Sequence, residues 1–158
     1  MNKISSDRPD IKYIIVDDAT FIMTQEFMQR AHETGFGKFT DIGQHMFFVL
    51  QAAKKLRDDI RVIFMFLEDY DAPEGLNPKK KIKTVGNAVD NYFDPQALTE
   101  VTLYTYITEQ DGKRTYNFLT NNFNNIPAKT PLGMFDSILI PNDLNQVLTI
   151  MNDFYSKS

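Results

Sequence analysis

Two short apolar runs in the first half of the chain each end in a pair of acidic residues. Residues 13–16 (YIIV) are followed directly by Asp17-Asp18, and residues 62–67 (VIFMFL) by Glu68-Asp69. An unbroken apolar run of this length is typical of a strand buried on both faces, as in a parallel sheet. The pattern therefore predicts two parallel strands that lie side by side, with their acidic ends at one edge.

Between these runs, the apolar spacing predicts two amphipathic helices. Thr24 is a candidate N-cap for a helix over residues 25–34, which Gly35 and Gly37 should end. A second helix is expected to begin near Asp41, with Gln44 completing a capping box. Its apolar residues recur at helical spacing, at Ile42, Met46, Val49, Leu50, Ala53 and Leu56.

The second half of the chain predicts a loop, a hairpin and a final helix. Residues 71–84 contain four lysines and no apolar periodicity, so we expect a mobile loop there, followed by a short helix within residues 85–93. Two alternating stretches flank Asp111-Gly112, which is a typical hairpin turn. The last helix should begin near Asn142, and its buried stripe comprises Leu144, Val147, Leu148, Met151 and Phe154.

Composition is consistent with one α/β domain over residues 1–158, with parallel strands first and an antiparallel hairpin later. The 158 residues are 42% hydrophobic and 13% aromatic, which is enough to form a core. The first residues lack the apolar stretch of a secretory signal, and no apolar run is long enough to span a bilayer. We therefore expect a cytoplasmic protein with no membrane contact.

The charge balance and the lack of cysteine exclude several kinds of binding or catalytic site. Seventeen basic and 21 acidic residues give a net charge of −4, which argues against a general nucleic-acid coat. The sequence has no cysteine, which excludes disulfides, thiolate zinc sites and cysteine nucleophiles. His32 and His45 are the only histidines, and both are expected on the surface.

The acidic strand ends form the candidate site. Ligands of open α/β sheets bind outside the carboxyl ends of the strands, where Asp17, Glu68 and Asp69 could hold Mg²⁺ or a magnesium-bound nucleotide. Acidic residues after buried strands are also common as ordinary solvated loop starts. The apolar strand before Asp17 favours a functional role.

Six segments, in the order in which they occur along the chain, together carry a resemblance to a known family. They are IIVDDATFIM, EFMQRAHETGFGKFTDIG, LRDDIRVIFMF, KIKTVGNAVDNY, AKTPLGMF and IPNDLNQVLTIMNDFY. Together they resemble a phage family of RecA-like, AAA-type ATP-binding proteins, some of which act in DNA recombination or single-strand annealing. The resemblance spans about residues 11–155. It implies a RecA-like fold in which Asp17 is the Walker B magnesium ligand and Asp18 is a candidate catalytic residue that polarises water.

The P-loop of this family is not in the sequence. Its G-x-x-x-x-G-K-[ST] pattern cradles phosphates, whereas residues 35–39 (GFGKF) have the wrong spacing and no hydroxyl after the lysine. The chain therefore resembles the C-terminal part of such an ATPase. Leu67 and Asn87 also stand where the family tends to have a polar sensor residue and a lysine. We expect ATP and Mg²⁺ as cofactors only if another chain supplies a P-loop.

The densest basic run comprises Lys79, Lys80, Lys81 and Lys83. In RecA-like proteins a loop at this place contacts single-stranded DNA or a neighbouring subunit, so these lysines are candidate DNA or partner contacts. A solvated loop is the favoured interpretation, because no aromatic residue interleaves with the lysines as a stacking platform. Tyr104, Tyr106 and Tyr116 could stack bases, although aromatic cross-strand pairs are more often structural.

Three functions remain open. The favoured one is a phage-type, P-loop-less RecA-like protein that acts through protein–protein interaction, as a homo-oligomer or as a regulator, decoy or inhibitor of a host system. The second is the C-terminal part of an active ATP-binding recombination or annealing protein. A receiver-like phosphorylation domain ranks last, because two helical stretches separate the acidic strands. In the first case, residues 62–66 should carry apolar sheet surface that needs a cover.

Overall fold

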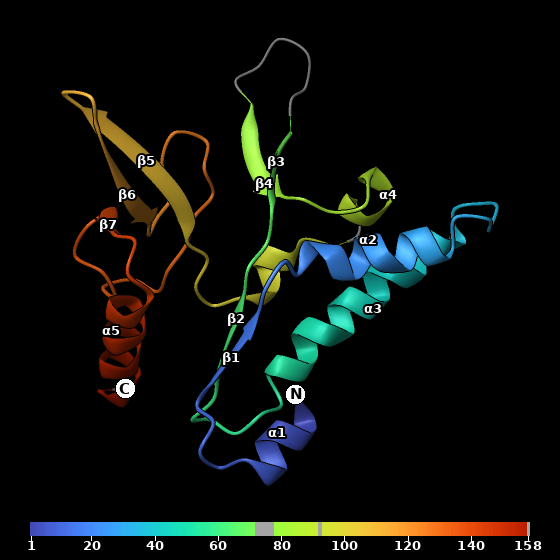
Figure 1. The fold of residues 1–158 in the computed structure, drawn as a ribbon, viewed down its shortest axis with the longest axis horizontal. Helices are drawn as coiled ribbons and strands as arrows, with labels where there is room; N and C mark the ends of the chain where they lie inside the picture. The colour runs from blue at the N-terminus through green and yellow to red at the C-terminus, as the bar shows by residue number, and fades with distance from the viewer. Residues whose placement is uncertain (72–77, 92, 158) are drawn as a thin grey trace. The chain divides into compact units, whose positions relative to one another are not determined.

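The described chain forms two compact units. The computed structural model describes residues 1–71, 78–91 and 93–157. One unit comprises Met1–Asp69 and Ile82–Leu98, and the other comprises Tyr70–Lys81 and Thr99–Ser158. Each unit has its own sheet (Figure 1). Each also has its own buried apolar cluster. The molecule is of the mixed α/β class, with small parallel and antiparallel sheets and a C-terminal helix.

A two-stranded parallel sheet and its helices make up the first unit. Its elements are α1 (Asn2–Asp7), β1 (Tyr13–Val16), α2 (Thr20–Gln29), α3 (Gly37–Ala53), β2 (Arg61–Phe64), α4 (Asn87–Asp90) and the 3₁₀ helix η1 (Pro95–Leu98). β1 and β2 pair in parallel, in a register that runs from Tyr13 opposite Arg61 to Val16 opposite Phe64. The prediction of two adjacent parallel strands is confirmed.

Both long helices of this unit begin earlier than predicted. α2 starts at Thr20, directly after the strand, and α3 starts at Gly37, which was expected to end a helix. Thr24 and Asp41 therefore lie inside the helices and not at their starts. Neither helix has a side-chain hydrogen bond at its N-cap. The predicted caps are wrong because the helices begin where the chain leaves the strand or turn, without a local capping signal.

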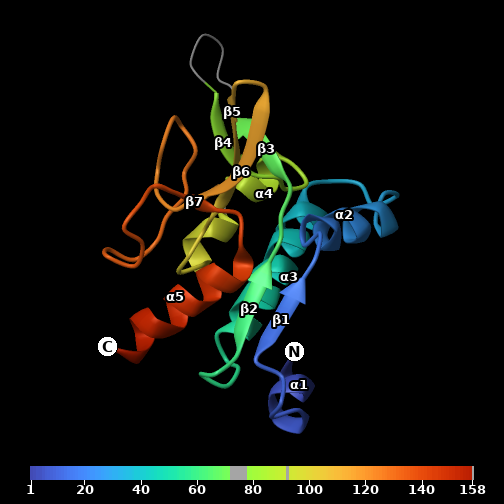
Figure 2. The ribbon, with the colours of Figure 1, turned by 60° about the vertical axis from the view of Figure 1, so that its left-hand side comes forward.

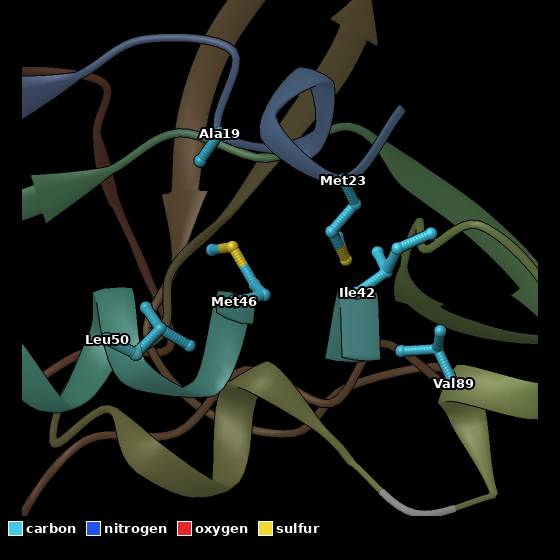
Figure 3. Packing of buried hydrophobic residues seen from close by; sticks show 6 residues of the cluster. All are labelled: Ala19, Met23, Ile42, Met46, Leu50 and Val89. Carbon is cyan, nitrogen blue, oxygen red and sulfur yellow. The ribbon is translucent and has the colours of Figure 1, made fainter. Parts of the chain in front are cut away.

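The core of the first unit lies between the sheet and its helices. Its buried cluster comprises Ala19, Met23, Ile42, Met46, Leu50 and Val89, whose side chains converge from the turn before α2 and from α2, α3 and α4 (Figure 3). Val16, Phe64 and Phe66 pack against this cluster from the sheet and the segment after it. One face of the parallel sheet therefore packs against the helices and forms one side of the core.

In the second unit a three-stranded antiparallel sheet precedes the last helix. Its elements are β5 (Tyr104–Gln110), β6 (Lys113–Leu119), β7 (Leu139–Pro141) and α5 (Leu144–Ser156), and the strand order is β5-β6-β7. The predicted hairpin is confirmed, with positive φ at Asp111 (52°) and Gly112 (73°), as a tight two-residue turn requires. Asp143 caps α5 by accepting hydrogen bonds from the amides of Asn145 and Gln146.

Two further strands, β3 (Glu68–Asp71) and β4 (Lys79–Ile82), pair with each other. The prediction of a loop over residues 71–84 is therefore wrong for residues 71 and 79–82, and residues 72–77 lie outside the described residues. An acidic strand (EDYD) faces a basic one (KKKI), and opposite charges on paired strands stabilise the pairing. This pairing is the physical reason that a lysine run forms a strand here.

Candidate functional site

Three hydrogen bonds tie the carboxyl end of β1 to the segment that follows β2. The Met65 amide donates to the Val16 carbonyl (3.0 Å), and the Ala19 amide donates to the Met65 carbonyl (2.8 Å). The Leu67 amide donates to the hydroxyl of Thr20 (3.0 Å), a side chain that is only 3% exposed. These bonds hold the turn between β1 and α2 in place.

Asp17 and Asp18 occupy that turn, and both are exposed. Asp18 has a φ of 47°, a left-handed conformation that Asp tolerates better than most residues. Its amide donates to a carboxylate oxygen of Asp17 (3.0 Å). The Asp17 carboxylate thus stabilises the turn. Among residues 1–71, 78–91 and 93–157, no group of three or more His, Cys, Asp or Glu residues is arranged to hold a metal ion.

Glu68 and Asp69 do not end the second parallel strand. β2 ends at Phe64, and both acidic residues belong to β3, which pairs with β4. The expectation that the apolar run continues as one strand up to Glu68 is wrong, because the chain leaves the parallel pairing after Phe64. The acidic residues at positions 17 and 68 therefore lie next to different sheets.

The lysine run is part of a charge-balanced pair of strands. Three lysines in β4 accompany three acidic residues in β3. The Lys80 ammonium lies 5.7 Å from the ring centroid of Tyr70. The backbone amide of Lys80 donates to the Asn125 carbonyl (3.0 Å). The Lys83 amide donates to the Leu67 carbonyl (2.8 Å). The balance of charge reduces the positive potential that a phosphate backbone would meet.

The tyrosines proposed to stack bases are not equally accessible. Tyr104 is buried (6% exposed) in the core of the second unit, with Tyr106 packed against that cluster. Tyr106 also makes an edge-to-face contact with Phe123, at 6.3 Å between ring centroids. Tyr104 is therefore a structural residue. Only Tyr116, which faces Ile107 across the hairpin, is exposed among the three.

A network of ion pairs joins α2 to α3. Arg30 contacts Glu26 (3.1 Å), Glu33 (2.7 Å) and Asp41 (2.8 Å), and these carboxylates, Glu33 foremost, raise the pKa of the Arg30 guanidinium. His45 Nδ1 lies 2.9 Å from the Glu26 carboxylate. His45 is exposed, so its predicted surface position is confirmed. The shallow hollow at this place is lined by Ile22, Gln25, Glu26, Gln29, Arg30 and His45. Its charged groups bind one another, which indicates a structural role.

The sheet of the first unit exposes its second face. Tyr13 and Ile15 of β1, and Met65 and Leu67 in the segment that follows β2, are between 43% and 56% exposed. Together with Ile63, which faces Ile15 in the register, they form what we call the outer sheet face. α3 lies against the opposite face (Figure 2). The prediction that β1 is buried on both faces is wrong, because the helices of the first unit pack against only one of them.

In the part of the chain that the structure describes, no helix is long and apolar enough to cross a membrane. No family model matches the chain, and no match was found among curated proteins or solved structures. The RecA-like resemblance stays a prediction.

Proposed function

We propose that this chain is a RecA-like interaction module that does not hydrolyse nucleotide by itself and binds a polypeptide through its outer sheet face. The observation that carries the proposal is the exposure of Tyr13 and Ile15 on β1 of the parallel sheet, together with that of Met65 and Leu67 in the segment that follows β2. Parallel sheets are normally covered on both faces, and contiguous exposed apolar patches mark interaction sites. A phage-encoded regulator, decoy or inhibitor of a host system would use such a surface.

The absence of a P-loop from the sequence supports the proposal that the chain does not hydrolyse nucleotide by itself. Without the glycine-rich amides and the lysine, the β- and γ-phosphates have no cradle. Asp17 also accepts the Asp18 amide, so its carboxylate already has a structural role. Purified protein should show no ATP hydrolysis above background. Turnover that disappears in the Asp17→Ala variant would refute this part and favour the alternative of an ATPase fragment.

The exposure of the outer sheet face can be tested by thiol labelling. Because the chain has no cysteine, Ile15→Cys introduces a single thiol at the centre of the face. Phe36→Cys is the exposed control, at a side chain that is 82% exposed and precedes α3, and Val16→Cys is the inner-face control. In dilute protein we expect Ile15→Cys to react nearly as fast as Phe36→Cys and much faster than Val16→Cys.

Protection of Ile15→Cys at every dilution would refute the proposal. It would mean that another part of the same chain covers the face in solution. Protection that appears only as a binding polypeptide is added, or as the protein is concentrated, is the expected result. Circular dichroism of the three variants checks that each one is folded.

A further inference from the structure

We propose that β5 is a docking edge at which a second copy of this chain adds its own β5, antiparallel, about a two-fold axis that passes between the two Ile107 residues. The inference goes beyond the proposed function, because it concerns a strand of the other unit and does not use the outer sheet face. It rests on the hydrogen-bond pattern of the three-stranded sheet and on the residues that β5 presents at its edge.

The hydrogen bonds of this sheet show which backbone groups of β5 point outward. The amide of Asn142, directly after β7, donates to the Tyr116 carbonyl of β6 (3.2 Å). Tyr116 therefore turns its backbone groups toward β7, and Ile107, its partner in the register, turns its own groups away from β6. Because hydrogen-bonded and non-bonded pairs alternate along an antiparallel ladder, Thr105 and Glu109 also point outward.

This edge of β5 is open in the part of the chain that the structure describes. β5 is an outer strand in the order β5-β6-β7, and no backbone hydrogen bond joins Thr105, Ile107 or Glu109 to another described segment on that side. All three residues are exposed. Another extended strand completes such an edge, because it supplies the missing donors and acceptors.

The two edges of the sheet differ in a way that points to pairing at β5. The opposite edge, β7, has only three residues, and the proline at its end has no N–H to donate. Short strands, prolines and charges are the means by which proteins prevent edge-to-edge association. β5 has seven residues and no proline, and its one charged side chain, Glu109, pairs with Arg114 (3.1 Å). β7 is thus protected against pairing, whereas β5 is not.

A second copy fits this edge in one register. In an antiparallel pair, hydrogen bonds form where outward groups of one strand meet outward groups of the other. Placing Ile107 opposite Ile107 of the second copy matches all three outward residues, because Thr105 then lies opposite Glu109 at both ends. A shift by two residues in either direction leaves one outward residue without a counterpart within β5.

The side chains are compatible with the same register. Ile107 (54% exposed) and Tyr116 (58% exposed) lie opposite each other on one face of the hairpin. Pairing about the two-fold axis joins them to the same two side chains of the second copy in one apolar row across the sheet. Glu109 faces a threonine and not its own copy, so like charges are not opposed. The edge is therefore self-complementary, as a two-fold interface requires.

Proline substitution tests the edge and leaves the hairpin in place. Proline is tolerated in an edge strand where the N–H that it removes points outward. Ile107→Pro deletes the central donors of the interface, and we expect it to weaken self-association in sedimentation velocity by about tenfold or more. Ile107→Val keeps the N–H and the branched side chain, so it should associate within about threefold of the unmodified chain. Far-ultraviolet circular dichroism checks that both variants are folded.

Opposite charges at one position test the register. Thr105→Lys places a lysine opposite Glu109 of the second copy at both ends of the interface, and it should strengthen association by about two- to tenfold. Thr105→Glu opposes two carboxylates at the same places and should weaken association by a similar factor. Thr34→Lys and Thr34→Glu make the same changes at an exposed residue of the first unit and correct for the effect of net charge.

Hydrogen exchange locates the interface on the strand. The amides of Thr105, Ile107 and Glu109 should exchange rapidly in dilute protein and become protected as the protein is concentrated. Protection at every dilution would overturn the inference, because another part of the same chain would then cover the edge.

Three other results would also overturn it. The first is a chain that stays monomeric up to about 1 mM. The second is self-association that Ile107→Pro leaves unchanged. The third is a shift in the same direction for Thr105→Lys and Thr105→Glu after correction by the Thr34 variants. The thiol of Ile15→Cys tests the proposed function separately, so failure of one proposal leaves the other standing.

Discussion

Replacement of Thr20 by valine tests the hydrogen bond that joins α2 to the segment after β2. The Thr20 hydroxyl accepts the Leu67 amide at 3.0 Å, and the side chain is 3% exposed. Valine preserves the shape of the side chain but turns a methyl group toward that amide. The hydrogen bond is part-buried, and a fully buried backbone N–H that loses its partner costs about 1–3 kcal/mol, so we expect the lower end of that range, about 1 kcal/mol. Thr20→Val should therefore lower the free energy of unfolding by about that amount.

Two matched variants separate the hydrogen bond from other effects of the change. Thr20→Ser keeps the hydroxyl and loses one methyl group, which costs about 1 kcal/mol. Thr24→Val makes the same chemical change in the same helix, where the hydroxyl only donates to the Thr20 carbonyl (3.3 Å). We expect Thr24→Val to cost less than about 0.5 kcal/mol, since that carbonyl is also an acceptor in the helix.

Urea unfolding followed by far-ultraviolet circular dichroism gives the free energies, and hydrogen exchange of the Leu67 amide gives a local reading. Thr20→Val should speed exchange of that amide, whereas Thr20→Ser should not. The reasoning would be refuted if Thr20→Val were as stable as the unmodified chain and the Leu67 amide remained equally protected.

Three other predictions concern stability. Met46→Ala should destabilise the protein by about 2–5 kcal/mol in urea unfolding, because the side chain is fully buried among α2, α3 and α4; a loss below about 1 kcal/mol would contradict this packing. Gly43→Ala should stabilise the protein by about 0.5–1 kcal/mol and raise the midpoint of thermal unfolding, since a new Cβ in this helix would come no closer than 3.5 Å to a side chain of α4; a lower midpoint would show that the contact does not yield. Hydrogen bonds from Lys12 and Arg57 lower the pKa of Asp59 to about 2, so its stabilisation is complete above its unfolded pKa of about 4 and is lost as the pH falls toward 2. The urea midpoint of Asp59→Asn should lie below that of the unmodified chain at pH 7 and converge with it near pH 2, and a gap that stays constant would contradict the assignment.

The features that sequence alone determined are those whose cause lies within a few neighbouring residues. The apolar run that begins at Tyr13 is a strand, and Asp111-Gly112 is a hairpin turn because both residues tolerate positive φ. The stripe of α5 is also local, since Val147 and Leu148 are buried as the helical spacing predicts. The sequence likewise identified Asp17 as the residue that follows the first strand.

Other features depended on contacts between distant residues. α2 begins at Thr20 without a side-chain hydrogen bond at its N-cap. The turn before it is held instead by the hydrogen bond between the Thr20 hydroxyl and the amide of Leu67, 47 positions away. The lysines of β4 form a strand because acidic β3 faces them. Ile15 and Val16 are both apolar neighbours in one run, yet only Val16 packs on the core. The hydrophobicity of a residue shows only that its side chain prefers burial. The helices that pack on one face of the sheet determine which of the two residues is buried.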